Sequence, residues 1–252
     1  MSEAEISRRD MLKKMALALG AAFLPAADAH ASAGRIYLAV PFHWQHHTLS
    51  CEAAALRMAA HYFGATWSED ELLRRMPVDT AQPRLEGDQV VWSDPNLVFP
   101  GNVNGWQLYQ GGLRERPERA RGRLWGYGLH APAIADMATR IGLSAEVLGG
   151  LGDVYESIDR GRVPIVIVPD GGRVEARRWA WYTPAGHAVR VINREHSVVV
   201  KGYSDGYVWV NDPKGQVARY DRGPFERAFS LLNSAVAIGR GARMAPVRHF
   251  AL

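Results

Sequence analysis

Apolar residues after Ser50 recur at the spacing of one helix face. The run ends at Gly64, a residue that commonly closes helices. The pattern therefore predicts a buried helix from about residue 50 to residue 63, with Ser50 as its N-cap. Its apolar positions are Ala55, Leu56, Ala59, Ala60 and Phe63.

Three further helices are predicted from their start and stop residues. Ser68 and Glu71 have the spacing of a capping box, in which each side chain bonds the other residue's backbone N–H. The other two helices carry Pro132 or Asp153 in the first turn, and each ends at a glycine. All three have apolar residues on one face.

Strand patterns dominate the second half of the chain. Residues 164–168 form a continuous apolar run, and residues 196–203 and 206–211 are β-rich runs joined by a Ser-Asp-Gly turn, which predicts a hairpin. Because helices come first and antiparallel strands later, we expect an α+β domain. Shorter elements are expected as strands at 36–40, 216–220 and 235–238 and a helix at 224–229.

Residues 77–128 lack clear periodicity, and residues 169–195 look like an insertion or a long hairpin. Irregular segments of this length usually line or cover a site in a compact enzyme. Their aromatic rings could line a peptide or glycan cleft, or could pack beneath the loops. These rings belong to Trp106, Trp125, Tyr127, Trp179, Trp181 and Tyr182.

Residues 1–33 have the three parts of an export signal. Arg8-Arg9 lies in a charged start, an apolar run extends over 15–24, and Ala29-His30-Ala31 is a small-x-small cleavage site, with Ala31-Ser32-Ala33 as its rival. The paired arginines and the weakly apolar run are similar to a twin-arginine signal, although Met11 stands where that pattern prefers Phe.

The signal predicts that residues 34–252 form the mature domain, exported already folded by the twin-arginine machinery to the periplasm or the medium. The apolar run is shorter than the ~20 residues of a comfortable membrane span, and the remaining sequence has no longer one, so we expect no membrane span after cleavage. The mild net charge of +4 gives no reason to expect nucleic acid as a partner.

Cys51 is the single cysteine of the 252 residues, which excludes a disulfide scaffold. It falls at the start of the predicted buried helix. The free N–H groups and the dipole at a helix N-terminus favour a thiolate, so Cys51 is a candidate nucleophile. The alternative is a buried structural cysteine among the alanines of the helix.

A thiol nucleophile requires a histidine partner and a donor for the oxyanion. His196 begins the first hairpin strand and Asp212 follows the second, so the pair should meet across the ladder. Gln45, six residues before Cys51, could aim its amide at the same carbonyl oxygen as the Cys51 N–H. Singly, His196 could be a sheet-edge residue, Asp212 a turn former and Gln45 an ordinary loop residue.

Together, three motifs resemble those of the double-glycine-leader (bacteriocin-processing) peptidase-like family. The resemblance implies a papain-like fold, with Cys51 as nucleophile, His196 as base and acid, Asp212 as its orienting partner and Gln45 in the oxyanion hole. The motifs are Gln45–Ala54 (QHHTLSCEAA), His196–Tyr203 (HSVVVKGY) and Tyr207–Pro213 (YVWVNDP).

The sequence departs from the family pattern beside the nucleophile. Gly-Pro commonly follows the family's cysteine, whereas Glu52-Ala53 follows Cys51. A carboxylate at this position would raise the thiol pKa if it pointed inward. Segments 77–128 and 169–195 exceed the family's minimal core, and the chain reads as exported, so leader processing is not carried over.

Two other histidine patterns could carry chemistry. His187 also precedes a β-rich run, but no Asp-Pro follows it, which favours His196 as the base. His43, His46 and His47 suggest a metal, but the sequence places no completing carboxylate nearby apart from Glu52, so we expect solvated loop histidines. We therefore expect neither a metal nor a cofactor.

These patterns predict an exported thiol hydrolase, a peptidase or amidase that acts on a peptide or protein through an acyl-enzyme. One alternative is an acyl transferase or transpeptidase that uses the same three residues with an amine acceptor. The other is a peptide-binding domain of the same fold without catalysis, for which Glu52 is the best support.

Overall fold

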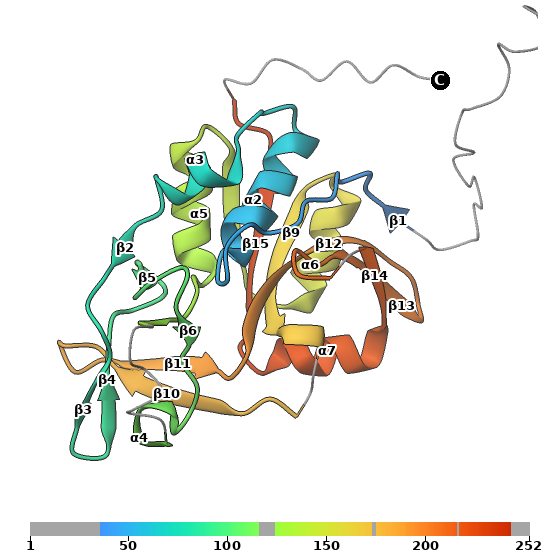
Figure 1. The fold of residues 1–252 in the computed structure, drawn as a ribbon. Coiled ribbons are helices and arrows are strands. Elements are labelled where there is room, and N and C mark those ends of the chain that lie inside the picture. The colour runs from blue at the N-terminus through green and yellow to red at the C-terminus, as the bar shows by residue number, and fades with distance from the viewer. Residues whose placement is uncertain (1–35, 116–123, 173–174, 216, 243–252) are drawn as a thin grey trace, which may run out of the picture. The chain divides into compact units, whose positions relative to one another are not determined.

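The structure is a computed structural model that describes residues 36–115, 124–172, 175–215 and 217–242. The predicted signal, residues 1–33, lies outside these ranges. The main element is an antiparallel seven-stranded sheet (Figure 1). Its strands in spatial order are β14 (Val217–Asp221), β13 (Tyr207–Asn211), β12 (Glu195–Tyr203), β9 (Val163–Pro169), β15 (Ser234–Gly239) and β8 (Ser144–Leu148), with β1 (Ile36–Tyr37) paired to β12.

Helices cover the centre of this sheet. Helix α2 packs on β12 and β9, α5 packs on β8 and β15, and α6 and α7 both contact β9. The helices are α2 (Cys51–Tyr62), α3 (Glu69–Leu73), α4 (Gly112–Glu115), α5 (Ala131–Arg140), α6 (Leu151–Asp159) and α7 (Arg222–Ser230). Within the described ranges, no helix has the length and apolar character that crossing a membrane requires.

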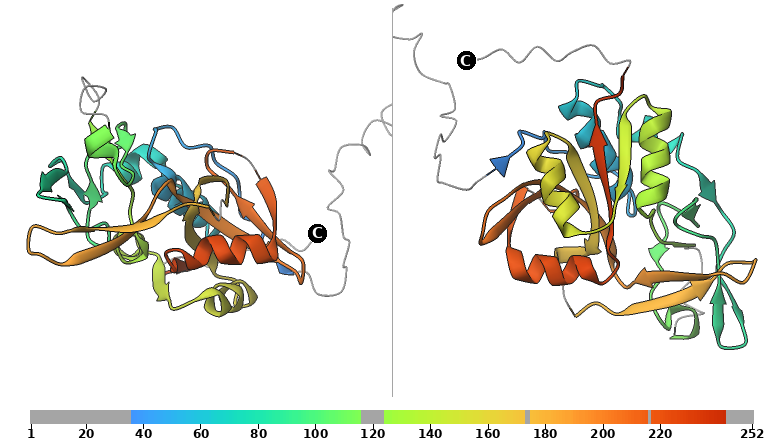
Figure 2. Two further views of the ribbon diagram at one scale, coloured as in Figure 1. Left: turned by 90° about the horizontal axis from the view of Figure 1, so that it is seen from below. Right: turned by 180° about the vertical axis from the view of Figure 1, so that it is seen from behind.

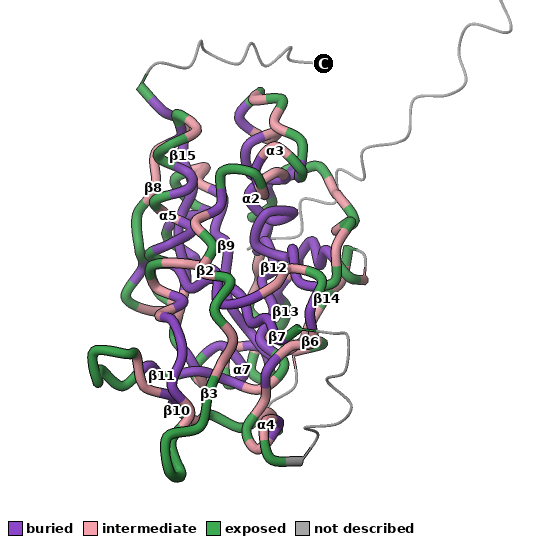
Figure 3. The backbone as a smooth tube through the Cα atoms, turned by 60° about the vertical axis from the view of Figure 1, so that its left-hand side comes forward, coloured by how far each residue is buried: buried purple, intermediate pink, exposed green. Residues whose placement is uncertain are grey.

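Burial along the strands follows their place in the sheet. Every residue of β9 is buried, as are all residues of β12 before Tyr203, so both faces of the sheet centre are covered (Figure 3). This explains the continuous apolar run predicted as a strand at 164–168. The edge strand β14 instead alternates between exposed and half-buried residues, because one of its faces meets solvent.

The two irregular segments form a smaller β-rich part. Its four-stranded sheet has the order β11 (Ala188–Ile192), β10 (Arg178–Tyr182), β4 (Gln89–Val91) and β3 (Arg84–Glu86). Figure 2 shows the β10–β11 hairpin extending from the main sheet to lie beside the segments that precede α5. Two strand pairs complete this part: β2 (Val78–Asp79) with β5 (Phe99–Pro100), and β6 (Trp106–Gln107) with β7 (Trp125–Gly126).

Most of the predicted elements are confirmed, with two differences. The capping box of Ser68 and Glu71 is present at α3. Ser50 occupies the N-cap of α2 but makes no capping bond, because its hydroxyl donates to the His47 carbonyl oxygen at 3.1 Å. Strand β8 was not predicted, because only its last residue is buried and its polar positions hide the strand pattern.

We expect Ile165→Ala in β9 to lower the free energy of unfolding by about 2–5 kcal/mol, since the side chain is fully buried at the sheet centre. Urea unfolding followed by circular dichroism measures this change. Val147→Ala on β8, where the side chain is half exposed, is the matched control and should change the free energy by less than about 0.5 kcal/mol. Equal effects of the two substitutions would contradict the assignment of β9 as the core strand.

Candidate active site

Hydrogen bonds join the segment before α2 to the end of β13 and the turn that follows it. The side chain of Asn211 donates to the carbonyl oxygens of Val40 at 3.0 Å and Pro41 at 3.3 Å. The backbone N–H of Gln45 donates to the carbonyl oxygen of Pro213 at 3.0 Å. The loop that leads into α2 is therefore tied to the turn that follows β13, and α2 itself packs on β12.

His196 and Asp212 form the hydrogen-bonded pair that the hairpin predicts. His196 Nε2 lies 2.6 Å from Asp212 Oδ1, which also accepts the Lys214 backbone N–H at 2.9 Å. Burial raises the pKa of the Asp212 carboxyl, but hydrogen bonds from His196 and from the backbone N–H groups of Lys214 and Gly215 lower it, and the net pKa is lowered. An ionised carboxylate can only accept, so the ring proton resides on Nε2 and Nδ1 presents a lone pair.

The free nitrogen of His196 is buried without a hydrogen bond. Its side chain is fully buried, and Nδ1 has no partner among the residues that the structure describes. The sulfur of Cys51 is therefore not hydrogen-bonded to the ring in this conformation. It interacts instead with the backbone of Ser197, the residue that follows His196, and with the carboxyl group of Glu52.

Cys51 is the first residue of α2 and is only 3% exposed. Burial raises the pKa of its thiol well above the ordinary value, and the charges of Glu52 and Glu195 raise it further. Lys214 and the Ser197 N–H oppose this rise without reversing it. Burial and the two nearby carboxyls therefore oppose the thiolate that the helix N-terminus is expected to favour.

Two glutamates lie buried at the site: Glu52, which the sequence singled out, and Glu195, which it did not. Glu52 points inward, and its Oε1 accepts the Leu129 N–H at 2.7 Å. Glu195 is fully buried, and the Gln107 amide donates to its backbone oxygen at 2.6 Å and to its Oε2 at 3.4 Å. Burial raises the pKa of Glu52 to about 7 and that of Glu195 well above the ordinary value. A glutamate opening an apolar strand was the signal that sequence analysis overlooked.

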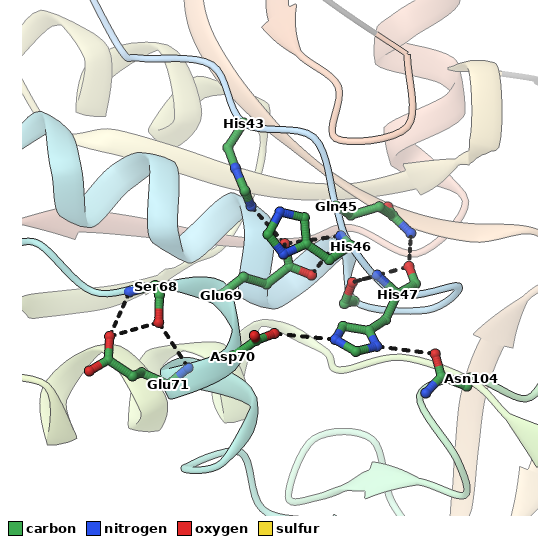
Figure 4. Close-up of polar contacts among 10 residues, drawn as sticks. His43, Gln45, His46, His47, Ser68, Glu69, Asp70, Glu71 and Asn104 are labelled. Atoms are coloured by element: carbon green, nitrogen blue, oxygen red, sulfur yellow. Dashed lines mark hydrogen bonds and ion pairs between the residues drawn. The ribbon is translucent and has the colours of Figure 1, made fainter.

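Gln45 lies in the loop before Cys51, but its amide is hydrogen-bonded to backbone oxygens of that same loop. Its Nε2 donates to the carbonyl oxygens of His47 at 2.7 Å and Thr48 at 3.0 Å, while its Oε1 is buried without a partner among the described residues (Figure 4). In this conformation the amide N–H groups are directed to backbone oxygens rather than to an empty oxyanion position.

The loop histidines are bound to carboxylates from helix α3. His43 Nε2 lies 2.7 Å from Glu69 Oε2, and the His46 backbone N–H donates to both oxygens of the same carboxylate (Figure 4). His47 Nε2 lies 3.3 Å from Asp70 Oδ1. The expectation that no carboxylate lies nearby is therefore wrong, because the α2–α3 connection brings Glu69 and Asp70 back to this loop. The His46 ring is nevertheless exposed, as expected of a loop histidine.

Donor atoms of His43, His46 and Glu69 lie within 4.8 Å of one another, which is close enough for a metal ion. However, both oxygens of Glu69 already accept N–H groups, and its side chain is fully buried. Hydrogen bonding therefore accounts for this buried carboxylate, which anchors the loop that carries Gln45.

The rival histidine and most of the aromatic residues lie elsewhere. His187 is exposed in the turn between β10 and β11. Trp181 and Tyr127 are buried in a second core, whereas Trp179 and Tyr182 line a cavity of about 410 Å³ beside α4 and the β3–β4 hairpin. Aromatic packing beneath the loops thus explains most of these rings, and two remain at a cavity wall that Cys51 and His196 do not line.

Gly128 packs directly on the buried carboxyl groups. A Cβ at this position would lie 2.2 Å from Glu195 Oε2 and 2.4 Å from Glu52 Oε1. We expect Gly128→Ala to lower the free energy of unfolding by about 2–3 kcal/mol, measured by urea denaturation, because neither neighbour can move freely. Gly152→Ala, with no atom near the new methyl group, is the control and should be neutral or slightly stabilising. A Gly128→Ala protein as stable as the control would contradict this packing.

Comparisons with known proteins agree with the fold. YvpB of Bacillus subtilis strain 168, described as uncharacterized, is 27% identical over 190 residues, which cover 75% of this chain and 68% of YvpB. The crystal structure of a C39-like peptidase from Bacillus anthracis matches with a TM-score of 0.64 and 22% identity, over 82% of this chain and 98% of that one. The peptidase domain of Streptococcus ComA, a bi-functional ABC transporter, matches with a TM-score of 0.44 and 14% identity, over 80% of this chain and 98% of that domain.

The family match covers both the nucleophile helix and the hairpin. The family model described as the Peptidase_C39 like family matches residues 37–236, a span that contains Cys51, His196 and Asp212. Helices combined with a large antiparallel sheet form the predicted α+β, papain-like architecture. The chain therefore belongs to the Peptidase_C39-like family.

Proposed function

We propose that this protein is an exported cysteine hydrolase that cleaves a peptide or amide bond through an acyl-enzyme on Cys51. The hydrogen-bonded pair of His196 and Asp212 carries the proposal, because it leaves a buried, unpartnered ring nitrogen on the strand that contacts Cys51. The family membership supports the choice of a peptide or amide substrate.

In the proposed mechanism His196 Nδ1 takes the proton of the Cys51 thiol as the sulfur attacks the substrate carbonyl carbon. Asp212 holds the ring in the required tautomer and stabilises the imidazolium. His196 then protonates the amine as it departs. The acyl group of the substrate remains bound to the sulfur. Water, deprotonated by the same nitrogen, attacks the acyl group and releases the acid.

Charge that develops on the carbonyl oxygen requires donors. The backbone N–H of Cys51, at the start of α2, is one candidate. Gln45 is the other, provided that its amide leaves the carbonyl oxygens of His47 and Thr48 when substrate binds. The mechanism therefore requires two local movements: the Cys51 sulfur must come into contact with Nδ1, and the Gln45 amide must turn.

A peptide-binding role without catalysis is the second candidate. The observation that favours it is the buried, neutral thiol of Cys51 beside two carboxyls. Such a domain would keep the fold of its family and would bind peptides without forming an acyl-enzyme. Transfer of the acyl group to an amine remains a variant of the catalytic proposal, because only the acceptor differs.

We expect iodoacetamide to label Cys51 near neutral pH and His196→Ala to lower the labelling rate by at least about tenfold, since the thiol loses its proton acceptor. Intact mass spectrometry measures the rate. Hydrolysis of a fluorogenic peptide library should disappear in Cys51→Ala. His187→Ala, a substitution in the exposed β10–β11 turn, is the matched control and should label as the unmodified protein does.

Unchanged labelling in His196→Ala would contradict the assignment of the base. Labelling without turnover of any library peptide, combined with peptide binding by Cys51→Ala, would favour the non-catalytic candidate. Adding a primary amine to a turning-over reaction separates hydrolysis from acyl transfer, because transfer yields the amide in place of the acid.

Export through the twin-arginine route is part of the proposal and is supported by the sequence of residues 1–33. We expect residues 1–33 to carry a fused, prefolded fluorescent protein across the inner membrane, and Arg8→Lys/Arg9→Lys to abolish this transport. Fluorescence in the periplasmic fraction measures the outcome. Lys13→Arg/Lys14→Arg keeps the charge outside the pair and should leave transport intact. Transport that survives loss of the arginine pair would contradict this route.

A further inference from the structure

Glu52 and Glu195 have no role in the mechanism proposed above, yet they lie beside its nucleophile. One carboxyl oxygen of each and the sulfur of Cys51 all lie within 4.8 Å of one another. Glu52 is 1% exposed and Glu195 is fully buried. Two carboxyl groups this close and this dry cannot both be ionised, because mutual repulsion adds to the loss of hydration.

The hydrogen bonds of the pair are incomplete if both groups are taken as ionised. Glu52 Oε2 and Glu195 Oε1 are then buried oxygens without a hydrogen-bond partner among the described residues. The other oxygens accept the Leu129 N–H and the Gln107 amide. A proton held between the two carboxyls would make one of them a donor and give the other a partner, as in other carboxyl pairs that share a proton.

Charged and titratable groups reach this cluster from several elements. Lys214 contributes positive charge from the turn after β13. Its side chain is 31% exposed, and its ammonium nitrogen also lies 3.9 Å from Asp170 Oδ2. Tyr127 is buried nearby, and its hydroxyl donates to the Ile192 carbonyl oxygen. The groups that interact with the pair are Cys51 from α2, Tyr127 from the segment after β7 and Lys214 from the turn after β13.

We propose that Glu52 and Glu195 share one proton and that the protonation state of this pair controls the ionisation of Cys51. With one proton, the pair carries a negative charge beside the sulfur and holds Cys51 as a thiol. When the pair takes a second proton from solvent, that charge disappears, and the thiol proton can pass to His196 Nδ1. The second step rests on the proposed function, whereas the shared proton does not.

The sign of the pH dependence follows from the carboxyl group that ionises first. The pKa of Glu52 is raised to about 7, and that of Glu195 is raised well above its ordinary value. Rising pH through about 7 therefore restores the negative charge, and the reactivity of Cys51 should fall. A lone thiol behaves in the opposite way, because its thiolate fraction and its alkylation rate increase with pH.

Two measurements on the purified full-length protein test the proposal. Infrared spectroscopy of the unmodified protein at pH 7.5 should show the carbonyl band of a buried protonated carboxyl group, and this band should be lost in Glu52→Gln/Glu195→Gln. Iodoacetamide should alkylate this double variant about tenfold faster than the unmodified protein at pH 8, and within about twofold at pH 5.5. Glu156→Gln, on the exposed face of α6, is the control and should match the unmodified protein.

If the double variant does not fold, Glu195→Gln provides the test. The remaining Glu52 loses its like-charged neighbour and gains an amide donor, so the pH at which alkylation declines should move to a lower value. A structural role alone would not move this midpoint. An absent carbonyl band, equal rates at pH 8, an unmoved midpoint, or a stoichiometric metal ion on the purified protein would each overturn the proposal.

A failure of the shared-proton proposal can be distinguished from a failure of the proposed hydrolase function. The infrared band and the alkylation rates require no turnover, so the pair can be established in a protein that hydrolyses nothing. Conversely, a hydrolase that depends on Cys51 and His196 but lacks the carbonyl band would keep the proposed function and lose the acid pair.

Discussion

The packing of the first turn of α2 against strand β12 is the contact on which the site depends. It places the sulfur of Cys51 against the backbone of Ser197 and brings the carboxyl of Glu52 to that of Glu195. Because almost no water reaches this contact, the protonation state of each titratable group in it depends on the neighbouring protein groups rather than on hydration. Burial and the two carboxyls therefore favour the neutral thiol form of Cys51 in this contact.

The same packing explains how a histidine can be fully buried and still be available for reaction. Asp212 and the Asp-Pro turn fix one nitrogen of His196, and hydrogen bonds from Asn211 and Gln45 tie that turn to the loop before α2. The other nitrogen is left as an acceptor inside the protein. The proposed reaction requires the sulfur of Cys51 to move into contact with this nitrogen.

The irregular segments contribute to the site as well as surrounding it. Gly128 and Leu129 come from the end of the first segment and contact the buried carboxyls, and Gln107 supports Glu195. Helix α3 acts in a comparable way on the other side, where Glu69 holds the loop that carries Gln45. The surroundings of the nucleophile are thus assembled from parts of the chain that carry no catalytic motif.

Much of the fold could be predicted from the sequence because local physics determines it. The helical period after Ser50, the capping box at Ser68 and the Ser-Asp-Gly turn each specify an element from neighbouring residues, and the pairing of His196 with Asp212 follows from the hairpin register. Strand β8 was hidden by its exposed side chains. Only the tertiary structure determined which polar groups lose contact with water. It buried Glu52 against Glu195 and brought Glu69 to His43. It also directed the Gln45 amide toward its own loop. Ionisation depends on that desolvation, which no spacing along the chain specifies.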